Sequence, residues 1–238
     1  MRIDPRLSLL AAALLAACGS QPSPAPDSTP TPDATAVPVS TATPEPTATA
    51  TPAPVTFTVG LPGIVDTLDP ANAAEPAALL ITRHLYDGLT RLSPGGTDVE
   101  PALAERWDVS ADATVYTFTL RSGVTFSTGT VFDSTAAKAN LDRWLNGTPS
   151  GAYPYVPAVW GGFADPVDST GAPLSNVQSV SAPAPDLLIV QLRRPDAGLP
   201  ATLAMPAFAI VDPAAWSTAG FGAAGAPSAG TGDFVLSA

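Results

Sequence analysis

Only two residues in this sequence could serve as a base beside a nucleophile. Covalent catalysis needs a nucleophilic side chain activated by a base, which a third group in turn orients. The sole histidine is His84 and the sole lysine is Lys138. Each falls inside a predicted helix as an isolated polar residue, which is typical of a structural side chain. We therefore expect no nucleophilic catalysis.

Acidic side chains are plentiful, but no two of them stand out as an acid–base pair for glycoside hydrolysis. Most early aspartates sit in turn or helix-cap contexts, which already account for Asp; they are Asp66, Asp69, Asp87, Asp108, Asp112 and Asp133. A later set lacks the ordered spacing and the glycine of a calcium loop; it comprises Asp165, Asp168, Asn176 and Asp186. The sequence predicts no enzyme, no metal site and no cofactor.

Composition narrows the class of protein further. The chain has 238 residues, of which 10 are basic and 21 acidic, giving a formal charge of -11. This balance removes the positive surface that nucleic-acid binding requires, so nucleic acid is not an expected partner. The single cysteine excludes an intrachain disulfide. The length suits one domain with extensions.

The amino terminus has the pattern of an export signal. Arg2 and Arg6 precede the apolar run Leu7–Ala17, whose helix would cover roughly 16 Å, well short of the roughly 30 Å needed to span a bilayer. Leu15-Ala16-Ala17-Cys18 resembles the lipobox of bacterial lipoproteins, which implies that residues 1–17 are removed and Cys18 is acylated. Acyl chains would hold the protein on a membrane. An ordinary secretory signal and a buried free cysteine stay open as alternatives.

Residues 18–54 predict a disordered tether. From Gln21 to Pro54 there are ten prolines and eight threonines, with no aromatic and no basic residue. Such a segment buries too little apolar surface to offset the loss of backbone freedom, and it favours polyproline II. An O-glycosylated spacer and a ligand for proline-binding modules are compatible with this tether. The folded part is then expected to begin near Val55.

The folded part alternates predicted strands and helices, which indicates a mixed α+β class. A strand over Thr56–Leu61 precedes a helix that starts at Pro76 and stops at a left-handed Gly88. The later predicted elements are strands over Val115–Arg121 and Val124–Ser127, a helix from Asp133 or Ser134 to Leu145, and a hairpin of Val177–Ala182 with Leu187–Arg193. Gly151–Phe163 and Ala164–Asn176 are expected to be irregular, with their aromatics in local core. Gly220–Gly232 is expected to be a flexible loop without phosphate-binding spacing.

Five motifs, taken together, resemble the extracellular solute-binding proteins of the peptide/nickel/opine class (family 5), which feed ATP-binding-cassette importers. In order along the chain they are Leu68-Asp69-Pro70, Tyr86–Leu92, Pro101–Ser110, Tyr116–Phe126 and Gly230–Phe234. The resemblance covers essentially all of residues 55–238. Asp233 departs from it, since the family usually has proline at that point.

The resemblance implies a fold, a function and partners. Members have two hinged lobes that close over a solute without a reaction, and a permease with ATPase subunits carries out transport. Ala74 and Glu75 fall where the first lobe faces the ligand, and Tyr153 falls where an aromatic contacts the ligand in peptide binders. The implied location is extracytoplasmic, in the periplasm or on the cell surface. Peptide, nickel chelate, haem and sugar all stay open as ligands.

The resemblance also implies an incomplete periplasmic-binding-protein-like lobe I, with the second lobe missing. One subdomain would comprise residues 55–98 and 200–238, and the inserted subdomain residues 99–199. We expect a lobe of this kind to bind solute weakly or not at all by itself, and to expose apolar sheet surface that favours self-association. A fragment of a longer reading frame, rather than a truncated product, stays open as the alternative. The competing hypothesis is a surface lipoprotein without a transport role, acting in adhesion or signalling on the same fold.

Overall fold

The computed structural model describes residues 60–61, 63–147, 153–163, 169–171, 174–223 and 225–236. All of them lie within one structural unit, Thr56–Ala238. The predicted signal at residues 1–17, the lipobox Cys18 and the tether at residues 18–54 lie outside the described residues. The same is true of residues 56–59 of the first predicted strand, while residues 60 and 61 are in neither helix nor strand.

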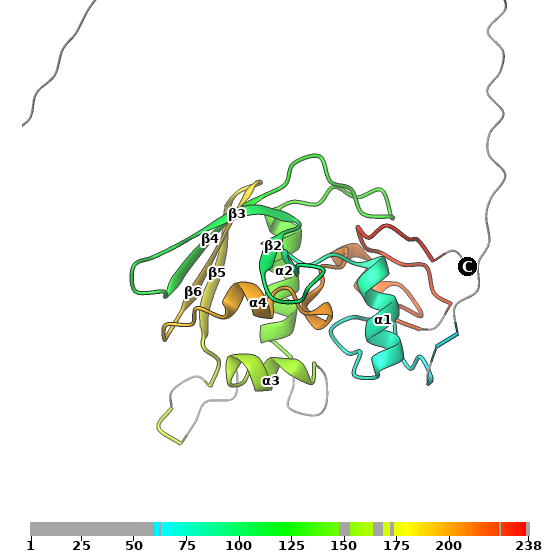
Figure 1. The fold of residues 1–238 in the computed structure, drawn as a ribbon, viewed down its shortest axis with the longest axis horizontal. Coiled ribbons are helices and arrows are strands. Elements are labelled where there is room, and N and C mark those ends of the chain that lie inside the picture. The colour runs from blue at the N-terminus through cyan, green and yellow to red at the C-terminus, as the bar shows by residue number, and fades with distance from the viewer. Residues whose placement is uncertain are drawn as a thin grey trace, which may run out of the picture. The chain divides into compact units, whose positions relative to one another are not determined.

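A four-stranded antiparallel sheet forms one layer of this unit (Figure 1). Its strands are β3 (Ala104–Val109), β4 (Val115–Leu120), β5 (Val177–Ala184) and β6 (Leu187–Leu192), in the order β3-β4-β6-β5. Alternate residues of the two central strands are buried, as expected when one face of a sheet packs on a core. They are Tyr116, Phe118, Leu120, Leu188, Val190 and Leu192.

Helix α2 (Ser134–Leu145) packs against strands β5 and β6 of this sheet. It begins where predicted, because the Asp133 carboxylate accepts a hydrogen bond of 2.9 Å from the Ala136 backbone N–H. Leu141 and Trp144 are fully buried in the core. The Trp144 ring meets Phe208 edge-on, with 5.2 Å between the ring centroids.

A second, smaller core lies beneath helix α1 (Pro76–Leu85). It joins residues before and within this helix to the segment that carries two short 3-10 helices, η1 (Pro206–Phe208) and η2 (Pro213–Ser217). Its buried members are Leu68, Leu85, Tyr86, Ala209, Val211 and Ala229. Chain segments more than a hundred residues apart therefore share this core.

Asn140 of α2 ties this second core to the sheet layer. Its side chain is fully buried, and its amide donates to the carbonyls of Ala136 at 2.9 Å and Val211 at 2.8 Å. Its Oδ1 accepts from the Val211 N–H at 3.1 Å. One side chain thus satisfies both backbone groups of Val211, which belongs to none of the strands in the part of the chain that the structure describes.

The remaining elements are short. Strands β1 (Thr90–Leu92) and β2 (Val99–Pro101) form a separate antiparallel hairpin. Helices α3 (Tyr155–Trp160) and α4 (Leu199–Thr202) each cover only a turn or so.

The structure confirms the helix at Ser134–Leu145 and the hairpin of β5 and β6, but the predicted end of the first helix is wrong. Helix α1 stops at Leu85, and Tyr86 after it is extended, with φ of -135°. Gly88 does not adopt the left-handed conformation. A Cβ added there would lie 2.6 Å from the Leu203 carbonyl oxygen and 2.7 Å from that of Thr90. Glycine is needed at this position for a close approach of backbone segments.

Two other local predictions need correction. Val124–Ser127 is no strand: only an isolated bridge links Thr125 to Val131. The stretch Gly151–Phe163 contains α3, which Pro157 concealed in the sequence. The aromatics of that stretch do serve as core, since Trp160 and Phe163 are buried.

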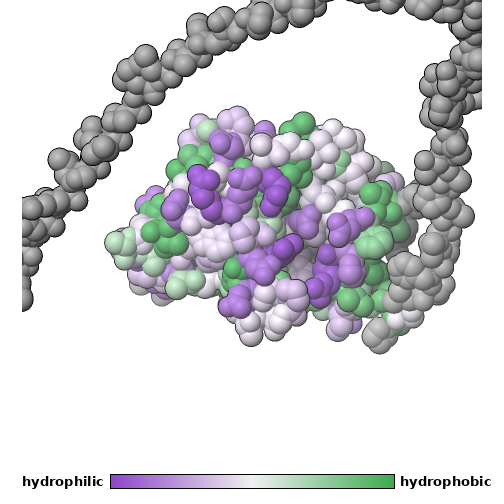
Figure 2. Space-filling model, turned by 45° about the horizontal axis from the view of Figure 1, so that its top comes forward, coloured by the Kyte–Doolittle hydropathy of each residue, from purple (hydrophilic) through white to green (hydrophobic). Residues whose placement is uncertain are grey.

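Apolar side chains also reach the surface. Those at least half exposed are Ile64, Val131, Phe234 and Val235. Figure 2 shows hydrophobic residues scattered around a largely hydrophilic middle on the visible face. Single exposed apolar residues are normal on soluble domains. The expected self-association of the chain therefore stays a prediction.

Candidate functional site

A nearly buried ion pair joins the last turn of α2 to the loop before α1. Arg143 meets Asp69 with both ends of its guanidinium, Nη1 to Oδ1 at 3.1 Å and Nη2 to Oδ2 at 2.5 Å. The side chains are only 15% and 6% exposed, respectively. Such bidentate pairs fix geometry as well as charge. When one partner of a buried pair is lost, the other becomes an uncompensated charge.

Local sequence places both partners. Asp69 sits in the Leu68-Asp69-Pro70 turn, where its backbone carbonyl accepts from the Asn72 N–H at 3.0 Å. Arg143 occupies the last turn of α2, where a cation is favoured by the helix dipole. The turn and the helix end therefore present opposite charges at the point where they meet.

Two further residues close this pair into a ring of contacts. The Asn72 side-chain amide donates to Asp69 Oδ2 at 2.7 Å, and its Oδ1 accepts from the Tyr153 backbone N–H at 3.1 Å. The Tyr153 ring lies over the Arg143 guanidinium, with 5.2 Å from Cζ to the ring centroid. We call Asp69, Asn72, Arg143 and Tyr153 the Arg143 network.

Aromatic rings surround the guanidinium on other sides. Trp216 of η2 lies 5.1 Å and Phe221 lies 5.5 Å from Arg143 Cζ, measured to the ring centroids. A cation over an aromatic face gains about 0.5 to 2 kcal/mol, more when it is shielded from water. The guanidinium of Arg143 thus interacts with one carboxylate and three aromatic rings.

The glycine-rich segment after η2 packs against the same place. The Gly222 carbonyl accepts from the Leu68 N–H at 2.6 Å and from the Thr67 hydroxyl at 3.1 Å. Gly222 has φ of +78°, and a Cβ added there would lie 2.9 Å from the Cβ of Asp69. Any larger residue would push this segment away from Asp69. Part of the predicted flexible loop is therefore held by hydrogen bonds.

The structure brings together the segments that carry the three predicted ligand contacts. Ala74 and Glu75 are exposed just ahead of α1, and the Glu75 side chain makes no capping hydrogen bond to the helix. Tyr153 is half-buried, and its N–H reaches Asn72, two residues before Ala74. Sequence reasoning missed Asn72 and Arg143, and identified Asp69 only as a turn residue. The family motif around Asp69 was the one available signal.

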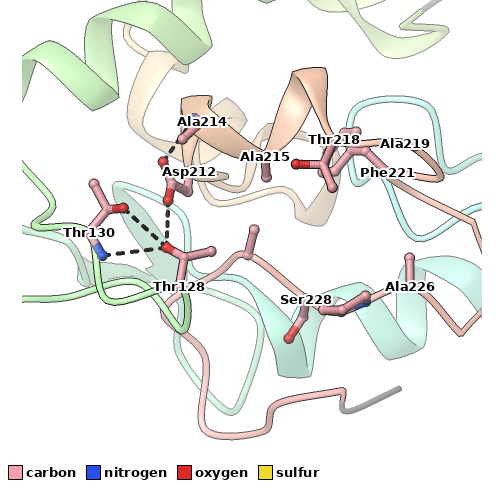
Figure 3. Close-up of a pocket in the computed structure, with 12 residues that line it drawn as sticks. Thr128, Thr130, Asp212, Ala214, Ala215, Thr218, Ala219, Phe221, Ala226 and Ser228 are labelled. Carbon is pink, nitrogen blue, oxygen red and sulfur yellow. Dashed lines mark hydrogen bonds between the residues drawn. The ribbon is translucent and has the colours of Figure 1, made fainter.

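A separate pocket of about 230 Å³ lies between η2 and the turn at Thr128 (Figure 3). The buried Asp212 faces it, but one of its carboxylate oxygens accepts from the Thr128 hydroxyl at 2.5 Å and the other from the Ala214 N–H at 3.0 Å. Alanine and threonine side chains make up most of the remaining wall. The pocket is smaller than usual ligand sites, which measure roughly 300 to 1,000 Å³.

The two candidate bases have structural partners. His84 is exposed, and its ring meets Phe234 edge-on with 5.9 Å between centroids. Lys138 forms an ion pair with Asp142, one turn along the same helix. Burial raises the pKa of Tyr86 to about 12, so its phenol stays protonated at neutral pH. The contacts of His84 and Lys138 are typical of a packing residue and of a surface charge, respectively.

The described residues lack two further features. No cluster of three or more His, Cys, Asp or Glu side chains that could hold a metal ion occurs in that part of the chain. No helix in the described ranges combines the length and the hydrophobicity needed to cross a membrane.

Comparison with known proteins adds sequence relatives. Residues 98–238 match the model of the bacterial extracellular solute-binding proteins, family 5 Middle. Over 80 residues, 34% of this chain, the sequence is 44% identical to the glutathione-binding protein GsiB of Salmonella paratyphi A. Over 74 residues, 31% of this chain, it is 45% identical to di/tripeptide-binding protein 2 of Pseudomonas aeruginosa. These segments span 15% and 14% of the two relatives.

The fold has solved counterparts as well. The periplasmic binding protein DppA from Helicobacter pylori, in complex with the peptide STSA, superposes with a TM-score of 0.54 at 27% identity. The match covers 65% of this chain and 30% of that structure, so the chain has part of a periplasmic-binding-protein fold of mixed helices and sheets. The family model covers more than half of the chain. The chain therefore belongs to the family 5 bacterial extracellular solute-binding proteins.

Proposed function

We propose that this chain belongs to the extracytoplasmic solute-binding component of an ATP-binding-cassette importer, and that its solutes are short peptides. One observation carries the proposal: the sequence relatives at 44% and 45% identity are named for glutathione, a tripeptide, and for di- and tripeptides. A permease with ATPase subunits is the proposed partner, and peptide binding is followed by transfer without reaction.

The exposed segment ahead of α1 provides groups that suit a peptide. The Glu75 carboxylate is exposed and offers a partner for a peptide amino group. Tyr153 offers an aromatic face whose backbone is tied to the same segment through Asn72. We propose Ala74, Glu75 and Tyr153 as ligand contacts. A peptide held in extended form would combine main-chain hydrogen bonds with such side-chain contacts.

We further propose the lobe organisation implied by the family. The four-stranded sheet is made entirely of residues 104–192, inside the proposed inserted subdomain of residues 99–199. The second core draws its buried residues from 68–86 and from 209–229, inside the two proposed pieces of the other subdomain, residues 55–98 and 200–238. The sheet and the second core support these boundaries, although the larger core also takes in residues from the other subdomain, namely Ala71, Leu89, Leu203, Ala207, Phe208 and Ile210.

The proposed location is the outer side of a bacterial membrane, with Cys18 as the lipid anchor and residues 18–54 as the tether. The signal-like run and the lipobox support this proposal. Feeding an alkyne-tagged palmitate to bacteria that express the chain should label it. The Cys18→Ser variant should take up no label. Equal labelling of both proteins would contradict acylation at Cys18.

Peptide binding can be tested at low affinity by NMR. An isotope-labelled chain titrated with reduced glutathione and with tri-alanine up to millimolar concentration should show amide shifts clustered at Ala74, Glu75 and Tyr153. Glycerol at the same concentration is the control. Shifts confined to the pocket beside Asp212, or no shifts at all, would contradict the proposed ligand contacts.

A further inference from the structure

We infer that Arg143 is a positioning residue for solute recognition, which holds Tyr153 against the Asp69–Glu75 segment. The inference rests on the proposed function, since it concerns the same ligand contacts. Arg143 does not itself face solvent enough to be a main ligand contact: its side chain is 15% exposed and its guanidinium is already paired with Asp69. Its effect on a solute would act through the residues it holds.

The contacts of the Arg143 network form a closed loop. Arg143 bonds to Asp69, Asp69 accepts from Asn72, Asn72 accepts from the Tyr153 backbone, and the Tyr153 ring returns to Arg143. Each of the four residues is therefore held by two others. Three stretches of chain meet in this loop, at residues 69–72, at the end of α2 and at residue 153.

The backbone of Tyr153 needs such support. Its φ of +57° lies in the left-handed region, which bulky residues seldom adopt. Strained residues of this kind persist when the surrounding structure holds them in place. Here the N–H is bound by Asn72 and the ring is bound by Arg143. When Arg143 is lost, Tyr153 loses one of these two supports directly, and Asn72 loses the fixed position of its partner Asp69.

A purely stabilising ion pair is the competing explanation, and α2 offers a matched control. Lys138 forms an ion pair with Asp142 on the same helix, but both of its side chains are more than a third exposed. Removing Lys138 also deletes one positive charge from α2, yet its ion pair is with Asp142, and within the described residues no hydrogen bond or ion pair links it to the Arg143 network. If Arg143 positions Tyr153, Arg143→Lys should therefore change the surroundings of Tyr153, and Lys138→Met should not.

The test uses fluorine NMR of the full chain grown with 3-fluorotyrosine. The chain has four tyrosines, and Tyr153→Phe assigns the resonance of interest. In Arg143→Lys and Arg143→Met, the Tyr153 resonance should shift more than that of Tyr86, which feels the charge of Asp69, while the resonance of the buried Tyr116 stays in place. Lys138→Met should move none of the three.

A second variant guards against loss of folding. Asp69→Asn combined with Arg143→Gln removes both charges, so no buried charge is left unpaired. It should fold and still shift the Tyr153 resonance, because neutral amides do not restore the cation beneath the ring. If the Tyr153 resonance moves no more than those of Tyr86 and Tyr116 in every folded Arg143 variant, the positioning role is wrong.

Measurements of glutathione binding distinguish failure of this inference from failure of the proposed function. With reduced glutathione as the probe, Arg143→Lys should weaken binding about tenfold, as the loss of one good polar contact does; Lys138→Met should leave it unchanged. If the unaltered chain shows no glutathione-induced shifts, the proposed function fails and the fluorine spectra still decide whether Arg143 positions Tyr153. If glutathione binds and Arg143→Lys binds it equally well, the positioning role in recognition is wrong.

Discussion

The sheet layer and the region around α1 are stabilised in different ways. Strands β3 to β6 form one antiparallel sheet, and buried side chains from them join α2 in the larger core. Among the described residues, the region around α1 has no sheet of its own beyond the short hairpin of β1 and β2. It relies on a small core, on turns, and on buried polar side chains such as Asn140, Asp69 and Arg143.

Because of this difference, we regard the sheet layer as the scaffold and the region around α1 as the part that carries the proposed site. A ladder of backbone bonds tolerates changes of side chain as long as the core is filled, because the bonds themselves do not depend on side-chain identity. A region held by side-chain hydrogen bonds depends on individual residues. The proposed ligand contacts Ala74, Glu75 and Tyr153 all lie beside the second kind of region, where small changes of position are easier.

The largest effect should come from emptying the centre of the larger core. Trp144 is fully buried against Trp160 and Phe208, and its indole N–H has no hydrogen-bond partner among the described residues, so its loss tests packing alone. Trp144→Ala should lower the free energy of unfolding in urea by about 4 kcal/mol. Trp107→Ala, at a half-buried position on edge strand β3, should cost clearly less. Equal losses of unfolding free energy in the two variants would contradict the expected difference between the core and the edge strand.

A slightly smaller effect is expected at the junction of the two regions. Asn140→Ala would leave the N–H and the carbonyl of Val211 buried and unpaired. The expected loss is about 3 kcal/mol in the same urea measurement, since each such group costs about 1 to 3 kcal/mol. Asn146→Ala, at the exposed end of α2, is the control and should change little. A loss at Asn140 no greater than at Asn146 would show that the regions are joined by other contacts.

The smallest predicted effect concerns the second core at alkaline pH. The pKa of Tyr86 is raised to about 12 by burial, against 10.0 for the free side chain. Between these values the unfolded chain loses the phenolic proton while the folded chain keeps it, so stability should fall as pH rises. The loss should approach about 2 kcal/mol by pH 12. Urea unfolding at several pH values should show a shallower decline for Tyr86→Phe; an unchanged decline would contradict this.

Sequence patterns predicted the scaffold better than the site. The alternation in Val115–Leu120 and the Asp133 cap were enough to place β4 and α2, since both signals are local. The irregular packing at Gly88 was not predictable, because its cause is a close approach to Leu203, more than a hundred residues away.

The same limit applies to the Arg143 network. Its members come from positions 69, 72, 143 and 153, and no local pattern marks them as neighbours. Family resemblance predicted Ala74, Glu75 and Tyr153 as ligand contacts, but it gave no reason why the segments that carry them should lie close together. That reason is tertiary: a turn, a helix end and a strained tyrosine meet around one guanidinium.

The most direct test of the central claim is photo-crosslinking with a tripeptide that carries a photoreactive benzophenone side chain. After irradiation with the full chain, mass spectrometry of the digest identifies the labelled residues. We expect labelling within residues 72–75 and at Tyr153, suppressed by excess reduced glutathione. Labelling that glutathione does not suppress, or that falls only around Asp212 and Thr128, would contradict the claim that this chain grips short peptides beside α1.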